Sequence, residues 1–548
     1  MMNLITRLRL GTGMIMGAFL MAPVMGVMYL TDKLVDLPFV PYDLFDWITR
    51  VLPGPLLTFG IDLMIDTMRL LNLSVANTAK TAEQAAAILQ FLFLGVAAVA
   101  VYFAVQSLRK TDSDLVSGLV LGALVGLPLA SISAGIGQST VNPVVNVAWL
   151  MVLFLAWGAA VSYTYRRLRL ADAEPPAVEP ETRVAKTIGR RQFLITLGAA
   201  NATITVLGGT VGELLARSDR RRLEEELAAS MAHKSDGSPR SPFPNTFDPV
   251  VPVPVTRPEY TPVKDHYKVF IRVEPTIIDG SNYQLPITGL VDNPLMLSLD
   301  EIREKYESQS HYVTLSCISG RLGTDLISTT QWTGISMQQI LDDSGVQSDA
   351  RYLHIRSGDG FYETVPLKEI AADERIMLTY AWDGNTLPVN HGFPLRIWRP
   401  GRHGMKQPKW ITSMELLSGY KQGYWVERGW DEMAKVQTVS VVDTVAVDAV
   451  FERGGQQFVP VGGISSVEVR VDGGQWNPTE LRSPLSETTW VIWRYEWPFE
   501  AGQHIFQVRA TDGDGTPQIE EFRENRPSGA TGLHTKTTTL QAPASSGT

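Results

Sequence analysis

Long charge-free runs fill the first third of the chain, whereas apolar and polar residues alternate over much of the rest. A helix needs about 20 apolar residues to cross a hydrocarbon core of roughly 30 Å. Four charge-free runs are long enough, and the longest divides into two at a polar turn near Gln138 and Pro143. The pattern therefore predicts five membrane-spanning helices, at residues 10–31, 84–108 and 192–212, with two more within 115–165.

Residues 51–73 form a different kind of apolar segment. Asp62, Asp66 and Arg69 recur every three or four residues and give this segment one polar face. A charge at the centre of a bilayer costs about 2.5–3.5 kcal/mol on insertion scales. We therefore predict an amphipathic helix that lies on the membrane surface against lipid, rather than a sixth span.

Clusters of basic residues give the orientation of the five spans. The positive-inside rule assigns the clusters at residues 7–9, 109–110 and 166–169 to the cytoplasm. Five spans satisfy all three clusters, and they place everything after residue 212 on the outer side of the membrane.

A distinctive motif stands at the start of the last span, Arg190-Arg191-Gln192-Phe193-Leu194. It resembles the twin-arginine export signal, which serves proteins that are already folded around a cofactor. The simpler interpretation is that the two arginines mark a cytoplasmic flank. With the export interpretation, we expect a multi-pass protein of a bacterial cytoplasmic membrane.

The remaining chain divides into three parts that differ in charge, proline content and hydrophobic pattern. Residues 213–262 begin as a highly charged helical stretch and continue as a proline-rich, semi-rigid linker. Residues 263–435 mix strand-like runs with short helices, which is typical of an α+β domain. In residues 436–548, apolar and polar residues alternate with period two in runs that are separated by Asp-Gly turns, which predicts an all-β sandwich. The predicted fold is therefore multidomain, beginning with an α-helical membrane bundle in residues 1–212.

Composition excludes several classes of protein. There are 48 Lys and Arg against 57 Asp and Glu, a net charge of −9, which argues against nucleic-acid binding. The single cysteine, Cys317, excludes an intramolecular disulfide and a cysteine-rich zinc or iron–sulfur site. No histidine precedes His233 and no Cys-x-x-Cys-His motif occurs, so we expect no haem in the membrane part.

Cys317 stands at the end of an apolar strand-like run, just before a glycine-rich turn. A lone cysteine is most often a small buried hydrophobic residue. A thiol at a strand end beside Gly320 and Arg321 is also well placed to become a thiolate that binds a soft metal or an electrophile.

The sequence from about residue 265 to 435 resembles the sulfite oxidase superfamily of molybdopterin enzymes, and residues 436–548 resemble the immunoglobulin-like dimerisation domain of that family. The motifs that carry the resemblance, in the family's order, are Leu315-Ser316-Cys317 with Gly320-Arg321, Gln331-Trp332-Thr333-Gly334, Ser357-Gly358-Asp359-Gly360-Phe361, Tyr380-Ala381-Trp382-Asp383-Gly384, His391-Gly392-Phe393-Pro394-Leu395-Arg396 and Gly404-Met405-Lys406 through Lys409-Trp410-Ile411.

The resemblance implies a role for each of these residues. Cys317 would supply the protein thiolate to molybdenum, whose other ligands include the dithiolene sulfurs of molybdopterin. Tyr380 matches the family's active-site tyrosine, with ordinary strand packing as the alternative, and Arg321 would help it to orient the substrate. The residues that would bind the phosphate and the ring edge of the pterin are His391, Arg396, Arg402, Lys406 and Lys409, with a solvated charged loop as the alternative.

The chain also departs from the family. In animal and plant sulfite oxidases the ligand cysteine is followed by an Asn-Arg element of the sulfite pocket, whereas here Ile318-Ser319-Gly320-Arg321-Leu322 follows. Sulfite is therefore one candidate substrate. The superfamily also includes a periplasmic reductase of protein methionine sulfoxide, and the same metal centre can transfer oxygen in either direction.

The sequence thus predicts a membrane-anchored molybdenum–molybdopterin oxidoreductase. It would transfer an oxygen atom to or from a small oxyanion or sulfoxide, and exchange electrons with an external carrier, a cytochrome or a quinone. The alternative is a non-catalytic, membrane-anchored binding or assembly protein with a degenerate molybdopterin domain. The tryptophans of the sandwich, Trp476, Trp490, Trp493 and Trp497, make a homodimer a further, weaker expectation.

Overall fold

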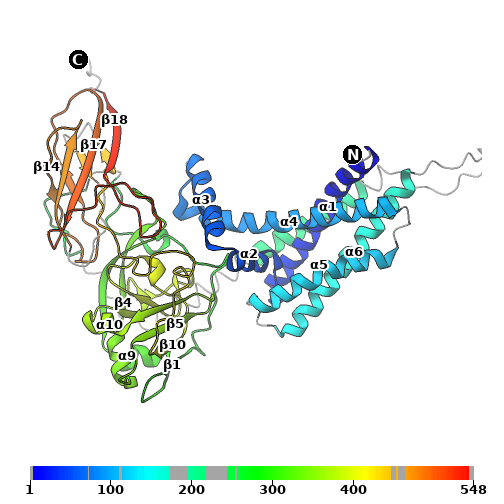
Figure 1. Ribbon diagram of the computed structural model, residues 1–548, viewed down its shortest axis with the longest axis horizontal. Helices are drawn as coiled ribbons and strands as arrows, with labels where there is room; N and C mark the ends of the chain where they lie inside the picture. Colours follow the sequence, from blue (N-terminus) through cyan, green and yellow to red (C-terminus); the bar gives the residue numbers. More distant parts are fainter. Residues whose placement is uncertain are drawn as a thin grey trace, which may run out of the picture. The chain divides into compact units, whose positions relative to one another are not determined.

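The computed structural model describes residues 4–71, 73–109, 114–137, 139, 141–172, 195–215, 243–252, 256–445, 452–454 and 463–541. The chain forms two compact units, which are described separately (Figure 1). The helical unit comprises residues 1–52 and 80–229, and the β-rich unit comprises residues 53–79 and 230–548. The motif at residues 190–194 and most of the charged stretch after residue 213 lie outside the described residues.

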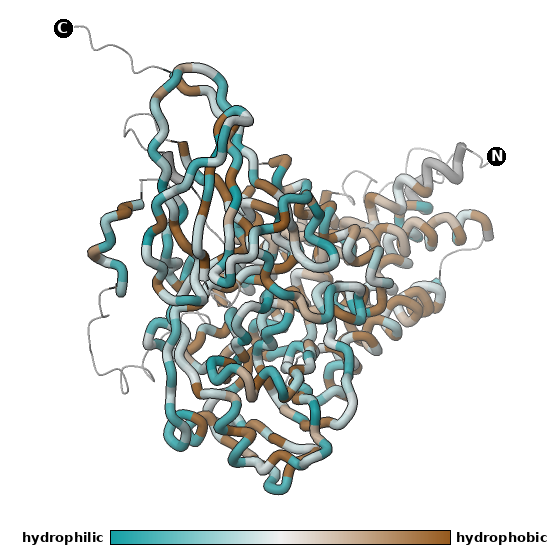
Figure 2. Tube along the Cα trace, turned by 60° about the vertical axis from the view of Figure 1, so that its left-hand side comes forward, coloured by the Kyte–Doolittle hydropathy of each residue, from teal (hydrophilic) through white to brown (hydrophobic). Residues whose placement is uncertain are grey.

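Long apolar helices make up the helical unit. Its helices are α1 (Leu4–Val35), α2 (Val40–Val51), α4 (Val75–Arg109), α5 (Leu115–Ile136), α6 (Pro143–Asp172) and a further helix at Ile195–Leu215. All except α2 are long and apolar enough to cross a membrane, which makes five candidate spans in the described chain, the number that the sequence predicts. Figure 2 shows the largely hydrophobic colouring of these helices.

Glycines allow α5 and α6 to pack closely. A Cβ atom on Gly158 would lie 2.1 Å from the carbonyl oxygen of Gly118, and one on Gly122 would lie 2.4 Å from that of Phe154. Small residues at such positions let helix backbones approach each other, which is how helices associate in lipid without a hydrophobic driving force. The chain is therefore a multi-pass membrane protein with a helical N-terminal region.

Two five-stranded sheets share one core in the first part of the β-rich unit. Buried residues of both sheets, such as Ile287, Leu353, Ile335 and Leu378, belong to a single hydrophobic cluster. The first sheet has the order β2-β1-β10-β5-β6, and the second has the order β3-β4-β7-β8 with β9 also paired to β7. The strands are β1 (Gln284–Gly289), β2 (Leu295–Ser298), β3 (Ser308–Ser316), β4 (Ile327–Ser336), β5 (Tyr352–Ser357), β6 (Tyr362–Pro366), β7 (Met377–Trp382), β8 (Asn385–Thr386), β9 (Arg396–Trp398) and β10 (Ile411–Leu417).

Short helices cover these sheets, as the α+β prediction requires. They are α8 (Leu299–Lys305), α9 (Met337–Ser344) and α10 (Leu367–Ala372), with 3-10 turns at Val263–Asp265, Val389–His391 and Gly404–Lys406. Ser298 and Glu301 form a capping box that fixes the start of α8. The amphipathic helix α3 (Gly54–Leu70) also belongs to the β-rich unit, although it stands between two membrane segments in the sequence.

Two further sheets make up the C-terminal part of the unit. Their orders are β14-β13-β17-β18 and β11-β12-β16-β15, and all of their pairings are antiparallel. Val467, Phe506 and Val508 of one sheet and Trp493 of the other share a buried cluster. The strands are β11 (Thr444–Val445), β12 (Glu452–Gly454), β13 (Ile464–Val471), β14 (Asn477–Pro478), β15 (Glu480–Leu481), β16 (Trp493–Tyr495), β17 (Gly502–Asp512) and β18 (His534–Leu540).

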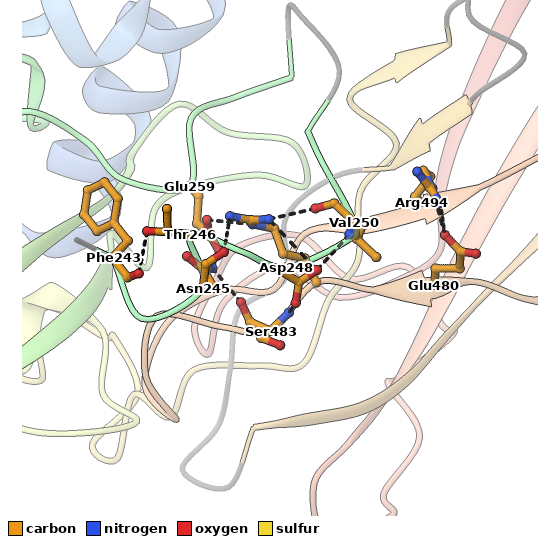
Figure 3. A network of polar contacts seen from close by, with 10 residues as sticks. Phe243, Asn245, Thr246, Asp248, Val250, Glu259, Glu480, Ser483 and Arg494 are labelled. Carbon is orange, nitrogen blue, oxygen red and sulfur yellow. Dashed lines mark hydrogen bonds and ion pairs between the residues drawn. The ribbon is translucent and has the colours of Figure 1, made fainter.

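The end of the proline-rich segment is bound to this C-terminal part (Figure 3). The buried Arg482 guanidinium donates to the carbonyl oxygens of Asn245 and Val250 at 2.9 and 2.8 Å, and pairs with Glu259 at 3.0 Å. The indole of Trp490 donates to the carbonyl oxygen of Glu259 at 2.7 Å. These contacts hold the described part of residues 243–262 against the C-terminal part of the unit. The proline content of the segment predicts a linker and gives no sign of these contacts.

Candidate functional site

Cys317 is the first residue after a fully paired strand. β3 pairs with β4 along its whole length, from Ser308 opposite Ile335 to Ser316 opposite Ile327. The Cys317 amide then donates to Leu326 at 3.0 Å, and its carbonyl oxygen accepts from the Gly320 amide at 3.1 Å. The hairpin therefore holds the cysteine backbone rigidly at the end of the sheet.

The Cys317 side chain is half-buried, with its Sγ 3.0 Å from the Ser319 hydroxyl oxygen. Removal of water by the surrounding protein raises the pKa of the thiol, and the hydrogen bond from Ser319 and the positive charge of Lys409 partly oppose this shift. The thiol thus has a hydrogen-bonding neighbour and a cation within electrostatic range.

Arg396 is a buried cation without an acidic partner. It lies on β9 opposite Thr379 of β7, and its guanidinium stacks over Trp332 and Trp382, 4.2 and 5.2 Å from the ring centroids. One Nη donates to the His391 carbonyl at 3.1 Å, but Nε has no hydrogen-bond partner among the described residues. Burial lowers the pKa of Arg396 to about 9, and no described carboxylate forms an ion pair with it.

Two histidines flank Trp382 next to this cation. The ring centroids of His266 and His391 lie 4.6 and 4.7 Å from that of Trp382, and 5.1 Å from each other. Burial lowers the pKa of His266 to about 3 and that of His391 well below its usual value, and the charges of Arg396 and Lys409 lower both further. Both imidazoles are therefore neutral at pH 7, and the fixed charges around them are positive.

Lys409 completes this electropositive group. Its ammonium donates to the Val269 carbonyl at 2.8 Å and lies over the rings of Phe270 and Trp410. Gly392 is required here, because it has φ +115° and a Cβ on it would lie 2.9 Å from the Lys409 Cβ. The sequence-predicted residues Cys317, His391, Arg396 and Lys409 are thus linked to one another by contacts or by charge.

Arg402 and Lys406 lie in different surroundings. Lys406 pairs with Glu363 at 2.9 Å, and both side chains are almost fully buried. Glu369 pairs with Arg402 at 3.2 Å and with Arg399 at 2.7 Å. The Glu363 carboxylate therefore neutralises Lys406, whereas Arg399 and Arg402 share the single Glu369 carboxylate, and Arg396 has no ion-pair partner among the described residues.

The two residues that the sequence assigns to substrate have their described contacts with other parts of the chain. Tyr380 occupies a bulge of β7, where its ring packs against the core shared by the two sheets and the Arg303 guanidinium lies 5.3 Å from its centroid. Arg321 follows the cysteine turn, and it pairs with Asp66 of α3 at 2.9 Å. Neither residue has a described contact with Cys317.

Tyr267 is a site residue that sequence reasoning missed. It is buried, the charge on Cys317 contributes to raising its pKa well above the usual range, and Arg396 acts in the opposite direction. Its hydroxyl approaches Gly404 closely, because a Cβ on that glycine would lie 3.2 Å from the phenolic oxygen. Together with His266, it begins the strand-like run at residues 266–273, which carries no motif and is not a strand in the structure.

The arrangement is suited to bind an anionic group beside a thiolate. The group holds a buried guanidinium whose Nε has no described partner, a His266 Nε2 that also has none, and the Lys409 charge that acts on Cys317. A phosphate-bearing cofactor with a soft metal would supply both the missing negative charge and an acceptor for the sulfur. The residues present therefore fit a molybdenum–molybdopterin group.

Comparisons with known proteins agree with this interpretation. The family model described as "Oxidoreductase molybdopterin binding domain" matches residues 272–425. The "Putative protein-methionine-sulfoxide reductase subunit YedZ1" of Azospira oryzae is 27% identical over 191 residues, covering 34% of this chain and 68% of that protein. The mitochondrial sulfite oxidase of Macaca fascicularis is 25% identical over 285 residues, covering 42% of this chain and 52% of that protein.

Among solved structures, the sulfane dehydrogenase SoxCD of Paracoccus pantotrophus aligns with a TM-score of 0.45 and 16% identity, over 54% of this chain and 89% of that one. The family model and the curated relatives agree. Residues 272–425 belong to an oxidoreductase molybdopterin-binding domain, which follows a helical membrane region, and this part of the chain is similar to sulfite oxidases.

Proposed function

We propose that this protein is a membrane-anchored molybdenum–molybdopterin oxidoreductase that transfers an oxygen atom to or from a small oxyanion or sulfoxide. One observation carries the proposal. The lone thiol of the chain is acted on by the charge of Lys409, which belongs to the same group as Arg396, a 2% exposed cation with no acidic partner among the described residues. A buried, uncompensated charge is costly, so such a site is stable when an anion binds there.

Each residue of the group has a role in this proposal. Cys317 binds the metal through sulfur, while Arg396 and Lys409 hold the anionic parts of the cofactor. His266 and His391 remain neutral and offer ring nitrogens as hydrogen-bonding groups. The cofactor, when bound, supplies the two-electron oxygen-transfer chemistry.

The surroundings of Cys317 favour one set of substrate contacts. We assign Tyr267 as a phenol near the reacting region, because a Cβ on Gly404 would lie 3.2 Å from its hydroxyl and 3.5 Å from the carbonyl oxygen of Ser316, which precedes Cys317. Burial raises the pKa of this phenol, and the charge on Cys317 also raises it. Arg321 remains our candidate for attracting an anionic substrate, through the loop it shares with the cysteine. Tyr380 and the pterin contacts of Arg402 and Lys406 remain predictions of the family resemblance.

The membrane part sets the location and the electron route that we propose. Positive loop clusters favour a bacterial cytoplasmic membrane with the β-rich unit on its outer side. Electrons would be exchanged with an external cytochrome or quinone, because the membrane helices contain no histidine. A homodimer through the C-terminal sheets remains part of the proposal.

Replacement of the thiol tests the function directly. In Cys317→Ser we expect molybdenum per chain and turnover of sulfite or sulfoxides, followed with redox dyes, to fall to background. The thermal midpoint should stay close to that of metal-free wild type, because the change itself removes one sulfur from a half-buried position. Ser319→Ala is the matched control, which should retain the metal.

Full turnover in Cys317→Ser would remove this assignment. A wild-type preparation without molybdenum or extractable pterin, from a host that makes the cofactor, would instead support the alternative of a binding or assembly protein. A screen of sulfite, sulfoxides and N-oxides in both directions would then identify the substrate class.

A further inference from the structure

Helix α3 presents an apolar stripe to its surroundings. Leu56, Phe59, Leu63 and Leu70 recur at spacings of three, four and seven residues, so they lie along one side of the helix. Their side chains are 58, 66, 58 and 83% exposed. A row of large apolar groups with this exposure costs free energy in water, which indicates that something covers this stripe.

Another side of α3 is fixed to the β-rich unit. Leu57, Ile65 and Met68 are buried. A Cβ on Gly54 would lie 2.8 Å from the carbonyl oxygen of Arg428, so the start of the helix touches that backbone. These contacts seat the helix by its inner side and leave the stripe facing outward.

The charged edge of α3 binds the loop that follows the cysteine. Asp66 pairs with Arg321 at 2.9 Å, and Asp62 pairs with Arg526 at 3.3 Å. Ser74 and Ala76 follow the helix in sequence. Asp325 accepts a hydrogen bond from the Ser74 hydroxyl at 2.7 Å and another from the Ala76 amide at 3.1 Å. The segment thus contacts the turn between β3 and β4 at its middle and near its end.

Chain continuity identifies what covers the stripe. A candidate membrane span begins at Thr78, eight residues after Leu70. Eight residues extend over at most about 28 Å, so the end of α3 cannot lie far from the membrane surface. An apolar stripe bordered by charges, on a helix this close to a span, has the composition of an interfacial membrane helix.

We propose that α3 is an interfacial helix whose stripe is inserted into the outer lipid–water boundary, while its inner side and charged edge hold the turn after Cys317. The occupant of the stripe is phospholipid. The membrane surface then supports the active-site loop through α3, independently of which substrate the enzyme uses.

Quenching by brominated lipid tests the proposal in the full-length protein. Leu63→Cys and Met296→Cys are labelled with bimane and reconstituted into phosphatidylcholine vesicles. Met296, on β2 of the same unit, is a matched control, since it is also an apolar side chain and is 58% exposed. The native chain, taken through the same labelling, gives the background from Cys317.

We expect brominated phosphatidylcholine to lower the emission at position 63 by roughly twofold or more, and to leave position 296 unchanged. Aqueous iodide should show the reverse preference. Strong iodide quenching at position 63 would show that water covers the stripe, and quenching by neither agent would indicate a protein partner such as a second copy. Either result would overturn the proposal.

Discussion

Arg396 and Lys406 are two buried cations of the same domain in opposite electrostatic situations. Lys406 lies 2.9 Å from the Glu363 carboxylate, and the exposures of the two side chains are 2 and 0%. Arg396 has two tryptophan faces and a carbonyl as neighbours, but no described carboxylate. The first cation is neutralised by the fold itself, whereas the second depends on a bound anion.

This contrast predicts stability changes of opposite sign. Arg396→Met should raise the thermal midpoint of metal-free protein, because it removes an uncompensated buried charge, while it abolishes retention of molybdenum. Lys406→Met should destabilise every preparation by about 3–5 kcal/mol, because it leaves Glu363 buried without a partner. Calorimetry and metal analysis of both variants check this, and a lower midpoint for metal-free Arg396→Met would contradict it.

The buried histidines predict an acid-sensitive fold. The pKa of His266 is about 3 in the folded protein, against about 6.5 when unfolded. Between these values the unfolded chain binds a proton that the folded chain does not, so stability falls as the pH falls from 6.5. At pH 5 the loss from His266 is about 2 kcal/mol.

Thermal midpoints measured from pH 7.5 to 4.5 check the histidine prediction. His266→Gln should flatten the pH dependence by the share that His266 contributes. An identical slope in the variant and the wild type would show that this histidine is not the cause.

Motif order identifies some site residues better than others. Cys317, His391, Arg396 and Lys409 were predictable as a set, because they sit at fixed places in short motifs, and the structure links them. The ion pairs of Arg402 and Lys406 were not, because their carboxylates lie more than thirty residues away on another strand and helix. Tyr267 was missed for a related reason, since tertiary packing alone couples it to Cys317.

At the scale of elements, residue spacing predicted α3 as an amphipathic helix but could not predict its partners. Asp66 and Arg321 are 2.9 Å apart in space and far apart in sequence. Their side chains are 53 and 39% exposed, so water and salt screen the pair and its free energy is at most about 1 kcal/mol. The pair matters because the Asp66 carboxylate competes with an anionic substrate for Arg321, the residue that we propose attracts the substrate.

Asp66→Asn should therefore lower the KM for sulfite by at most about fivefold at low ionic strength, with kcat unchanged. Asp62→Asn is the matched control, because Asp62 is one turn away on the same helix and pairs with Arg526 instead. Steady-state kinetics at two salt concentrations check both variants. Equal effects of the two changes, or an effect that does not shrink in high salt, would contradict a specific role of Arg321.

At the scale of the whole molecule, charge-free runs predicted the helical region, and the mixture of strand-like and helical patterns predicted the α+β character of residues 263–435. Both predictions rest on local periodicity in the sequence. They did not predict that α3 belongs to the β-rich unit, or that residues 243–262 are bound by Arg482. Both features rest on contacts between distant segments, which leave no periodic signal.

The proposed orientation can be tested by labelling intact spheroplasts. A membrane-impermeant maleimide should react with Asp514→Cys, on an exposed turn of the C-terminal sheet, without permeabilisation. It should react with Arg167→Cys, exposed near the end of α6, only after permeabilisation. The reverse pattern would show that the β-rich unit faces the cytoplasm.

The ion pair between Asp62 and Arg526 joins residues 464 positions apart. Residue 62 therefore leaves the ribosome long before its partner has been made, and this ion pair can form only after the intervening polypeptide has been synthesised and folded. The contact of α3 with Arg526 is consequently the last of its described ion pairs that can form during synthesis. A nascent chain stopped between residues 215 and 526 has all five candidate spans, but Asp62 on its α3 lacks the arginine with which it pairs in the finished protein.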